Sequence, residues 1–213
     1  MKKPREVEYT TYTFLVYTVD MAARGTAREI AVAARRLLDK EGAEGVTMRR
    51  VAQAAGITAM AIYRHYPDRA ALLNALANQG FEELGALLKG RRFSGDSQTR
   101  LARMADLFLD HALENPRLFE LMFLKTREGA RKYPGDFRAR RSPTATPMAD
   151  ILARGMAGGE FKRDDEWEIT FEIGALSHGL IMLYLGGRTE MGAAAFRALY
   201  RRSVQRFIDG ILT

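Results

Sequence analysis

From Thr26 to the end of the chain, apolar residues return at intervals of three and four positions almost throughout. An α-helix completes a turn every ~3.6 residues, so this spacing gathers the apolar residues on one helix face. The first such stripe contains Ile30, Ala33, Ala34, Leu37 and Leu38. Beyond residue 20, no stretch alternates convincingly between apolar and polar residues, as a half-buried strand would. The pattern therefore predicts an all-α fold.

Composition narrows the class of protein. The chain has 213 residues, of which 47% are hydrophobic and 28% charged, which argues against a disordered chain and against an integral membrane protein. Cysteine is absent, which excludes a disulfide scaffold, a thiolate zinc site, an iron–sulfur centre and a cysteine nucleophile. The formal net charge of +7 favours a polyanionic partner.

The first 21 residues form a separate segment, in which Lys2, Lys3 and Arg5 precede a short apolar run rich in Thr and Tyr. A basic stretch followed by an apolar one is the outline of a secretory signal, but no small-x-small cleavage site follows. We therefore expect residues 1–21 to be a flexible leader, with secretion or a natural start at Met21 as alternatives. No apolar run reaches the roughly 18 to 20 residues of a membrane span, so no membrane partner is expected.

Residues 47–66 have the spacing of a helix-turn-helix. Thr47 and Thr58 are each placed to cap a short helix, and Gly56 suits the left-handed turn between them. The second helix of such a unit can enter a DNA groove ~12 Å wide while polar and cationic side chains grip phosphates. The candidates for that grip are Thr47, Thr58, Tyr63, His65 and Arg69. The two threonines would cap their helices, and Tyr63 could pack in the core, even in a protein that does not bind DNA. The prediction of DNA binding therefore depends on the helix-turn-helix spacing and not on any single residue.

The local charge of this segment also favours DNA. Between residues 47 and 69, the arginines Arg49, Arg50, Arg64 and Arg69 face a single acid, Asp68. We therefore expect residues 22–72 to form a helix-turn-helix DNA-binding domain. A fourth helix over 68–89 would connect it to a second domain over 90–213, in which 129–147 is a surface loop.

The segment resembles the N-terminal domain of the tetracycline-repressor (TetR) family of transcriptional regulators. The residues that match the family pattern in register are Thr47, Val51, Ala52, Ala55, Gly56, Ile57, Thr58, Ile62, Tyr63, His65 and Leu72. Two positions depart from it, Tyr66 in place of Phe and Arg69 in place of Lys. The resemblance implies a DNA-binding regulator that responds to a small-molecule inducer, uses no cofactor and is not an enzyme. It also implies that residues 90–213 form a ligand-binding and dimerisation domain.

By that resemblance, the recognition positions fall on Ala59, Met60 and Ala61, whose side chains make no hydrogen bonds to bases. We therefore expect base discrimination from contacts with thymine methyl groups, from Arg49 or Arg50, and from DNA shape.

A predicted helix over 164–185 is apolar on nearly every side from Ile173 onward, so it needs covering on two faces. We expect a second subunit to cover one face, with a last helix over 193–212 completing a two-fold four-helix interface. The expected interface residues are Leu176, Leu180, Leu183, Tyr200, Val204, Phe207 and Ile211. One large monomeric core is the alternative.

Trp167, Phe171, His178 and Met182 are spaced so that they share one face of the predicted helix over 164–185. Residues of the shorter helices are expected to pack against this face. The resemblance places an inducer cavity there, lined by Phe108, His111, Phe119, Met122, Phe123, Trp167, Phe171, His178 and Met182. Core packing explains the same residues at least as well.

These observations predict a cytoplasmic, ligand-responsive regulator, a repressor by family analogy, that binds double-stranded DNA as a homodimer. The alternatives are a non-enzymatic helical adaptor with a basic surface and a small hydrolase. Ser177 and His178 are adjacent, so on a helix they point ~100° apart, and no Gly-x-Ser-x-Gly is present. Asp110, His111 and Glu114 lack a further ligand pattern, so no metal site is expected.

Overall fold

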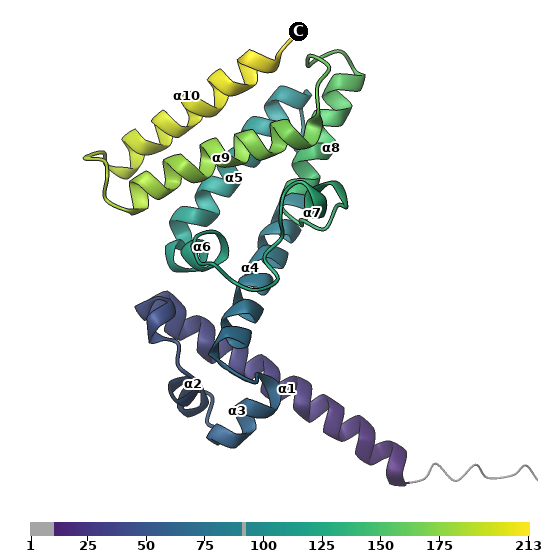
Figure 1. Cartoon of the computed structure of the whole chain (residues 1–213), viewed down its shortest axis with the longest axis vertical. Coiled ribbons are helices and arrows are strands. Elements are labelled where there is room, and N and C mark those ends of the chain that lie inside the picture. The colour runs from purple at the N-terminus through teal and green to yellow at the C-terminus, as the bar shows by residue number, and fades with distance from the viewer. Residues whose placement is uncertain (1–10, 91–92) are drawn as a thin grey trace, which may run out of the picture. The chain divides into compact units, whose positions relative to one another are not determined.

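A computed structural model describes residues 11–90 and 93–213 of the chain (Figure 1). Within these ranges the backbone forms ten α-helices and one short 3-10 helix, and its only strand-like pairing is an isolated bridge between Phe161 and Leu212. The predicted all-α fold is therefore confirmed. The chain divides into two compact units, of which the first ends at Leu76 and the second begins at Ala77. Among the helices described, none is both long and apolar enough to cross a bilayer.

The first unit is built around three helices and the start of a fourth. Its elements are α1 (Thr11–Glu41), the 3-10 helix η1 (Ala43–Gly45), α2 (Met48–Ala54), α3 (Ala59–His65) and the first turns of α4 (Arg69–Gly90). The helices contribute fully buried apolar side chains to one core, among them Ile30, Ala34, Leu38, Val51, Ile62 and Leu72. The predicted apolar stripe of α1 is thus the face that packs on α2.

Helix α1 begins at Thr11, well before the start that periodicity predicts near Thr26. Residues 11–21, expected to be a flexible leader, are therefore helical, while residues 1–10 of that leader lie outside the described residues. No glycine or proline occurs between Thr11 and Arg24, and adding a turn to an existing helix is easier than nucleating a new one.

The second unit packs its longer helices around α5. Its elements are the rest of α4, α5 (Ser97–Glu114), α6 (Pro116–Phe123), α7 (Gly135–Arg138), α8 (Ala145–Ala157), α9 (Glu166–Leu185) and α10 (Ala193–Ile211). Helix α5 contacts α8, α9 and α10, and α9 contacts both α8 and α10. In Figure 1, α9 and α10 run side by side across this unit.

Side-chain caps fix where two of these helices begin. The Asp96 carboxylate accepts a hydrogen bond from the backbone N of Thr99 at 2.8 Å and starts α5. The Asp165 carboxylate accepts from the backbone N of Trp167 at 2.9 Å and of Glu168 at 3.3 Å, and starts α9. Each cap satisfies amide groups that have no partner within the helix.

The segment over residues 129–147 is more ordered than the predicted surface loop. It contains the short helix α7, and α8 begins within it at Ala145. The Ser142 hydroxyl is buried and accepts from the backbone N of Ala145 at 3.2 Å. This hydrogen bond holds the backbone of the first turn of α8, so the helix begins inside the segment expected to be a loop.

Candidate functional site

Helices α2 and α3 form the helix-turn-helix that the sequence predicts. The Thr47 hydroxyl accepts from the backbone N of Arg50 at 3.4 Å, and the Thr58 hydroxyl accepts from the backbone N of Ala61 at 3.2 Å. Gly56 has φ 68° in the turn between them, a left-handed conformation that costs glycine little. The two caps mark where α2 and α3 begin, and the turn at Gly56 joins the helices.

One face of α3 is apolar and open to solvent. Met60 is 69% exposed and Tyr63 is 51% exposed, whereas Ile62, between them in sequence, is fully buried and packs into the unit's core. Thr58, Ala59 and Arg64 are exposed as well, and Ala61 and His65 are half-buried. Tyr63 is therefore not a core residue. A helix that turns methionine and tyrosine toward water has a surface suited to binding.

Arg50 is engaged within the unit. Its two terminal nitrogens donate to the two carboxylate oxygens of Glu41 at 2.5 and 2.6 Å, and one of them also donates to the Gly45 carbonyl at 3.1 Å. The hydrogen bond from Arg50 lowers the pKa of Glu41 and raises the pKa of Arg50. This guanidinium joins the end of α1 to α2 and would have to leave Glu41 to read a base.

Arg69 is also engaged within the unit. Its Nε donates to the Val46 carbonyl at 2.8 Å, and a terminal nitrogen donates to the Ala43 carbonyl at 2.7 Å and lies 3.4 Å from the Glu44 carboxylate. The guanidinium thus joins the first residue of α4 to the segment that precedes α2. This placement differs from the expected phosphate-directed cation.

The other two arginines of the segment are exposed. Arg49 lies on α2, and Arg64 lies in the last turn of α3. Because both guanidinium groups are accessible to solvent, they are better placed than Arg50 and Arg69 to meet phosphates.

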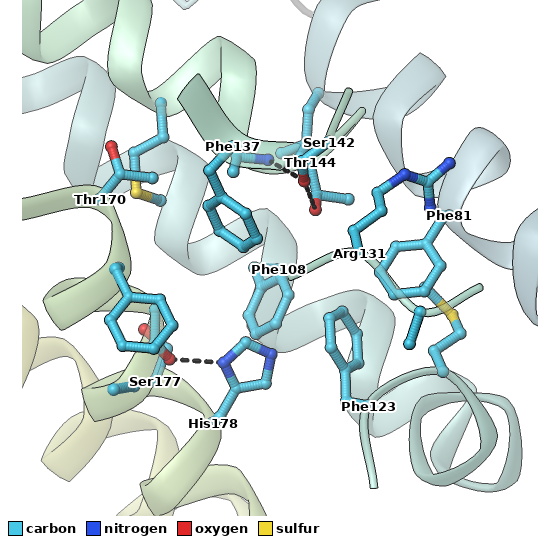
Figure 2. Close-up of a pocket in the computed structure, with 18 of the residues that line it drawn as sticks. Phe81, Phe108, Phe123, Arg131, Phe137, Ser142, Thr144, Thr170, Ser177 and His178 are labelled. Carbon is cyan, nitrogen blue, oxygen red and sulfur yellow. Dashed lines mark hydrogen bonds between the residues drawn. The ribbon is translucent and has the colours of Figure 1, made fainter. Parts of the chain in front are cut away.

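The second unit contains a partly open cavity of about 400 Å³. Five of the nine residues expected to line a cavity do so, namely Phe108, Met122, Phe123, Phe171 and His178. Figure 2 shows Phe108, Phe123 and His178 gathered on one side of it. Helices α5, α6 and α9 therefore meet as predicted, with their aromatic side chains around a hollow.

The other four expected residues lie elsewhere. Phe119 is fully buried behind the lining, with its ring 4.8 Å from that of Phe123. His111 and Trp167 are buried outside the lining, and Met182 is 44% exposed. Fifteen residues at about 100° each leave Met182 about 60° away from Trp167 around the helix, so spacing alone overstated the shared face.

Sequence reasoning missed the lining residues that come from the chain between α6 and α8. This segment supplies Lys125, Arg127, Ala130, Arg131, Phe137, Ser142 and Thr144. Its basic composition was visible in the sequence, but a segment without periodicity does not predict which side chains turn inward.

His178 has one ring nitrogen satisfied and one open. Its Nδ1 lies 2.6 Å from the Gly174 carbonyl, which can only accept, so Nδ1 carries the proton. Its Nε2 is buried and has no hydrogen-bond partner among the described residues. Burial lowers the pKa of His178, so the ring is neutral near pH 7. A neutral ring of this tautomer presents Nε2 as a hydrogen-bond acceptor.

The neighbouring serine does not form a catalytic pair with His178. The Ser177 hydroxyl accepts from the Tyr200 hydroxyl at 3.0 Å, while His178 bonds to the backbone of its own helix. Asp110, the carboxylate considered for a metal site, forms an ion pair with Arg197. The Ser177 hydroxyl and the Asp110 carboxylate are thus engaged in contacts within the unit, and neither is arranged for hydrolysis or for binding a metal ion.

The outer face of α9 carries apolar side chains. Leu176 and Leu180 are half-buried, and Leu183 is 51% exposed. On α10, Phe207 and Ile211 are half-buried as well. The expected interface therefore contains residues whose apolar surface remains open in the single chain.

Two of the expected interface residues belong to the chain's own core. Tyr200 is fully buried, and its hydroxyl lies within hydrogen-bond distance of the Ala105 carbonyl at 3.2 Å as well as of Ser177. Val204 is buried one turn further along α10. Both lie on the face of α10 that packs against α5 and α9, so they leave no surface for a partner.

The chain matches known proteins over both units. Residues 30–76 match the family described as bacterial regulatory proteins, tetR family, and residues 101–207 match a tetracyclin repressor-like C-terminal domain. The tetracycline repressor protein class A from transposon 1721 of Escherichia coli is 26% identical over 160 residues, which are 75% of this chain and 67% of that protein.

Solved structures share the fold along most of the chain. A protein of unknown function from Rhodococcus sp. RHA1 matches with a TM-score of 0.73 and 26% identity, over 88% of this chain and 95% of its own. A TetR variant from Acinetobacter baumannii AYE, in complex with minocycline, matches with a TM-score of 0.62 and 18% identity, over 85% of this chain and 93% of its own.

Proposed function

Since the chain belongs to the tetR family of bacterial regulatory proteins, whose members are transcriptional regulators and not enzymes, we propose that it is a ligand-responsive repressor that binds a pseudo-palindromic operator as a homodimer. The observation that carries this proposal is the solvent-facing apolar surface of α3, with Met60 and Tyr63 exposed beside the buried Ile62. A helical adaptor with a basic surface has no need for such a face.

In this proposal, α3 enters the major groove. Ala59, Met60 and Ala61 present methyl and thioether groups, which favour thymine methyl groups over polar base edges. Thr47, Thr58, Tyr63 and His65 supply hydroxyl and imidazole groups to the flanking phosphates, and Arg49 and Arg64 supply exposed charge. Arg50 and Arg69 serve mainly to hold the unit in shape, because their donors are occupied within it.

The homodimer is supported by the open apolar surface on α9 and α10. Two copies related by a two-fold axis would cover it with the same surface of the partner, since such interfaces are self-complementary. Two recognition helices would then meet successive turns of the operator, about 34–36 Å apart on B-DNA.

The ligand-binding role is supported by the cavity in the second unit. Its size, about 400 Å³, falls within the range typical of small-molecule sites. The fold is shared with a protein seen in complex with minocycline. A ligand that binds better to the form with low DNA affinity would release the operator, and a coupling free energy of ~1–3 kcal/mol is enough for regulation.

Selection of bound sequences from a random DNA duplex pool tests the DNA part of this proposal. We expect enrichment of a two-fold symmetric sequence, and loss of that enrichment in Met60→Asp, which places a carboxylate in the groove. Val32→Asp is a matched control, because Val32 is also exposed but lies on α1. Uniform binding of every duplex, with affinity that depends only on salt, would support the basic adaptor instead.

A further inference from the structure

The charged side chains that line the cavity all have the same sign. Among the described residues that line it, Lys125, Arg127 and Arg131 are charged, and none is an aspartate or a glutamate. Lys125 has a partner at the protein surface, because its Nζ lies 3.5 Å from the Glu120 carboxylate. The two arginines therefore determine the electrostatic character of the cavity.

Arg127 is partly buried without enough acceptors. One terminal nitrogen donates to the side-chain oxygen of Asn78 at 3.3 Å, but its Nε is buried and has no hydrogen-bond partner among the described residues. Burial, and then the charge of Arg131, lower the pKa of Arg127. A buried donor without an acceptor costs free energy, and a ligand oxygen at this position would remove that cost.

Arg131 lies beside Arg127 over the same aromatic ring. The guanidinium carbons of Arg127 and Arg131 lie 5.2 and 5.4 Å from the centre of the Phe81 ring. The Arg131 Nε donates to the Arg141 carbonyl at 2.7 Å, which fixes the side chain, while a terminal nitrogen reaches only to 3.7 Å from the exposed Glu82. Figure 2 shows Arg131 and Phe81 on one side of the cavity, away from His178. Two neighbouring cations that share one exposed carboxylate carry an excess of positive charge, which favours a bound anion.

The rest of the lining suits an apolar body. Aromatic and methionine side chains surround the space, among them Phe108, Phe123, Phe137, Phe171 and Met148. The His178 Nε2 is the one buried acceptor left open on the side away from the arginines, among the lining residues described.

Taking the cavity to be the ligand site proposed above, we infer that its ligand is an amphipathic organic acid. The ionised acid group binds Arg127 and Arg131, the mainly aromatic body fills the space among the phenylalanines, and a hydroxyl or N–H group donates to His178 Nε2. Among the described residues, a neutral or cationic ligand would leave Arg127 with only its hydrogen bond to Asn78, and Arg131 with only the exposed Glu82 carboxylate at 3.7 Å, to offset their charges.

Two fluorescent probes that differ by one acid group test this inference on the full chain. 8-Anilinonaphthalene-1-sulfonate is an aromatic anion with an N–H donor, and N-phenyl-1-naphthylamine is the same molecule without the sulfonate. We expect the anion to bind at least about tenfold more tightly than its neutral twin. Arg127→Met and Arg131→Met should each remove most of that advantage and change the affinity of the neutral probe less than about twofold.

Two further variants locate the probes. Arg163→Met removes the same charge from an exposed position outside the lining, and should change neither affinity. Gly174→Phe fills part of the cavity, since Gly174 belongs to the lining and, among the described residues, only His178 Nδ1, at 4.0 Å, lies near a Cβ built there. It should weaken the binding of both probes.

The outcomes separate the ligand class from the ligand site. If Gly174→Phe weakens both probes but the arginine variants bind the anion as tightly as the unmodified chain, the acid inference is overturned and the cavity remains the ligand site. If Gly174→Phe weakens neither probe, both probes bind elsewhere, and the inference and the ligand part of the proposed function fail together.

Discussion

At the scale of single residues, the arginines of the helix-turn-helix unit have two different roles. Arg50 and Arg69 donate to a carboxylate and to backbone carbonyls of the unit, whereas Arg49 and Arg64 face solvent. The first pair therefore contributes to folding and the second to the electrostatic surface. Stability and DNA affinity should separate when these arginines are replaced one at a time.

Arg69→Met should lower the free energy of unfolding by about 1–2 kcal/mol, because two carbonyls lose a charged donor in a partly exposed site. Arg64→Met, the same change at an exposed position, should alter stability by less than about 0.5 kcal/mol but weaken DNA binding and its salt dependence. Urea unfolding and DNA titrations at several salt concentrations measure the two effects. Equal losses of stability in both variants would contradict this division of roles.

His178 should make stability depend on pH. Its pKa is lowered by burial in the folded chain, while in the unfolded chain it titrates near pH 6.5. The unfolded chain therefore binds more protons as the pH falls below about 6.5, so the folded chain loses stability there. Between about pH 7.5 and pH 5.5, the free energy of unfolding should fall further in the unmodified protein than in His178→Gln. Parallel curves for the two proteins would show that His178 does not titrate differently on folding.

The roles that could be predicted from the sequence are those that depend on interactions between residues close together in the chain. The caps at Thr47 and Thr58 and the turn at Gly56 depend on neighbouring residues, so spacing predicted them correctly. Arg69 donates to carbonyls 23 and 26 positions earlier in the chain. No local sequence pattern distinguishes such an arginine from one whose guanidinium is available to bind a phosphate.

At the scale of helices, α8 packs closely against the bridge that follows it. The helix runs past Gly155, where an added Cβ would lie 2.3 and 2.5 Å from two ring carbons of Phe161 and 3.0 Å from the Ser97 Cβ. Phe161 is almost fully buried and pairs with Leu212. The absence of a side chain at Gly155 therefore lets α8, α5 and the chain end meet.

Gly155→Ala should lower the free energy of unfolding by about 1–3 kcal/mol, because the ring of a core residue must shift. Alanine is otherwise the better helix former by about 1 kcal/mol, so the sign of the effect is itself informative. Gly210→Ala is the matched control on α10, where no described neighbour lies within 4 Å of an added Cβ, and it should leave stability unchanged or slightly raised. A higher free energy of unfolding in Gly155→Ala would mean that the Phe161 ring moves away from the added Cβ at little cost.

Helical periodicity predicted the long elements well and the cavity only in part. Helix α9 was expected over 164–185 and extends from Glu166 to Leu185, because its apolar run and acidic first turn are properties of the segment itself. The cationic end of the cavity comes from Arg127 and Arg131, which lie in the chain between α6 and α7. Their inward direction depends on tertiary contacts with Phe81 and Arg141 that no repeat encodes.

At the scale of the whole molecule, the apolar surface of α9 and its neighbourhood is the feature that a single chain leaves unexplained. Met182, Leu183, Leu185 and Met191 are all more than one-third exposed. Leaving such a surface in water forgoes ~25 cal/mol for each Å² that a partner would bury. In the proposed homodimer, a second copy would cover this surface with the same surface of its own, and it would also supply the second recognition helix that a symmetric operator needs.

Leu183→Glu should convert the proposed homodimer into monomers, because each interface would bury a carboxylate near its symmetry-related copy without a counter-charge. Leu87→Glu is the matched control, since Leu87 is similarly exposed but lies on α4. Sedimentation velocity measures the mass of each variant.

A monomer should lose operator affinity by more than about tenfold while it keeps weak, salt-dependent binding to any duplex, because phosphate contacts need only one unit. A dimeric Leu183→Glu with full operator affinity would place the subunit interface elsewhere, and the exposed face of α9 would then need another partner.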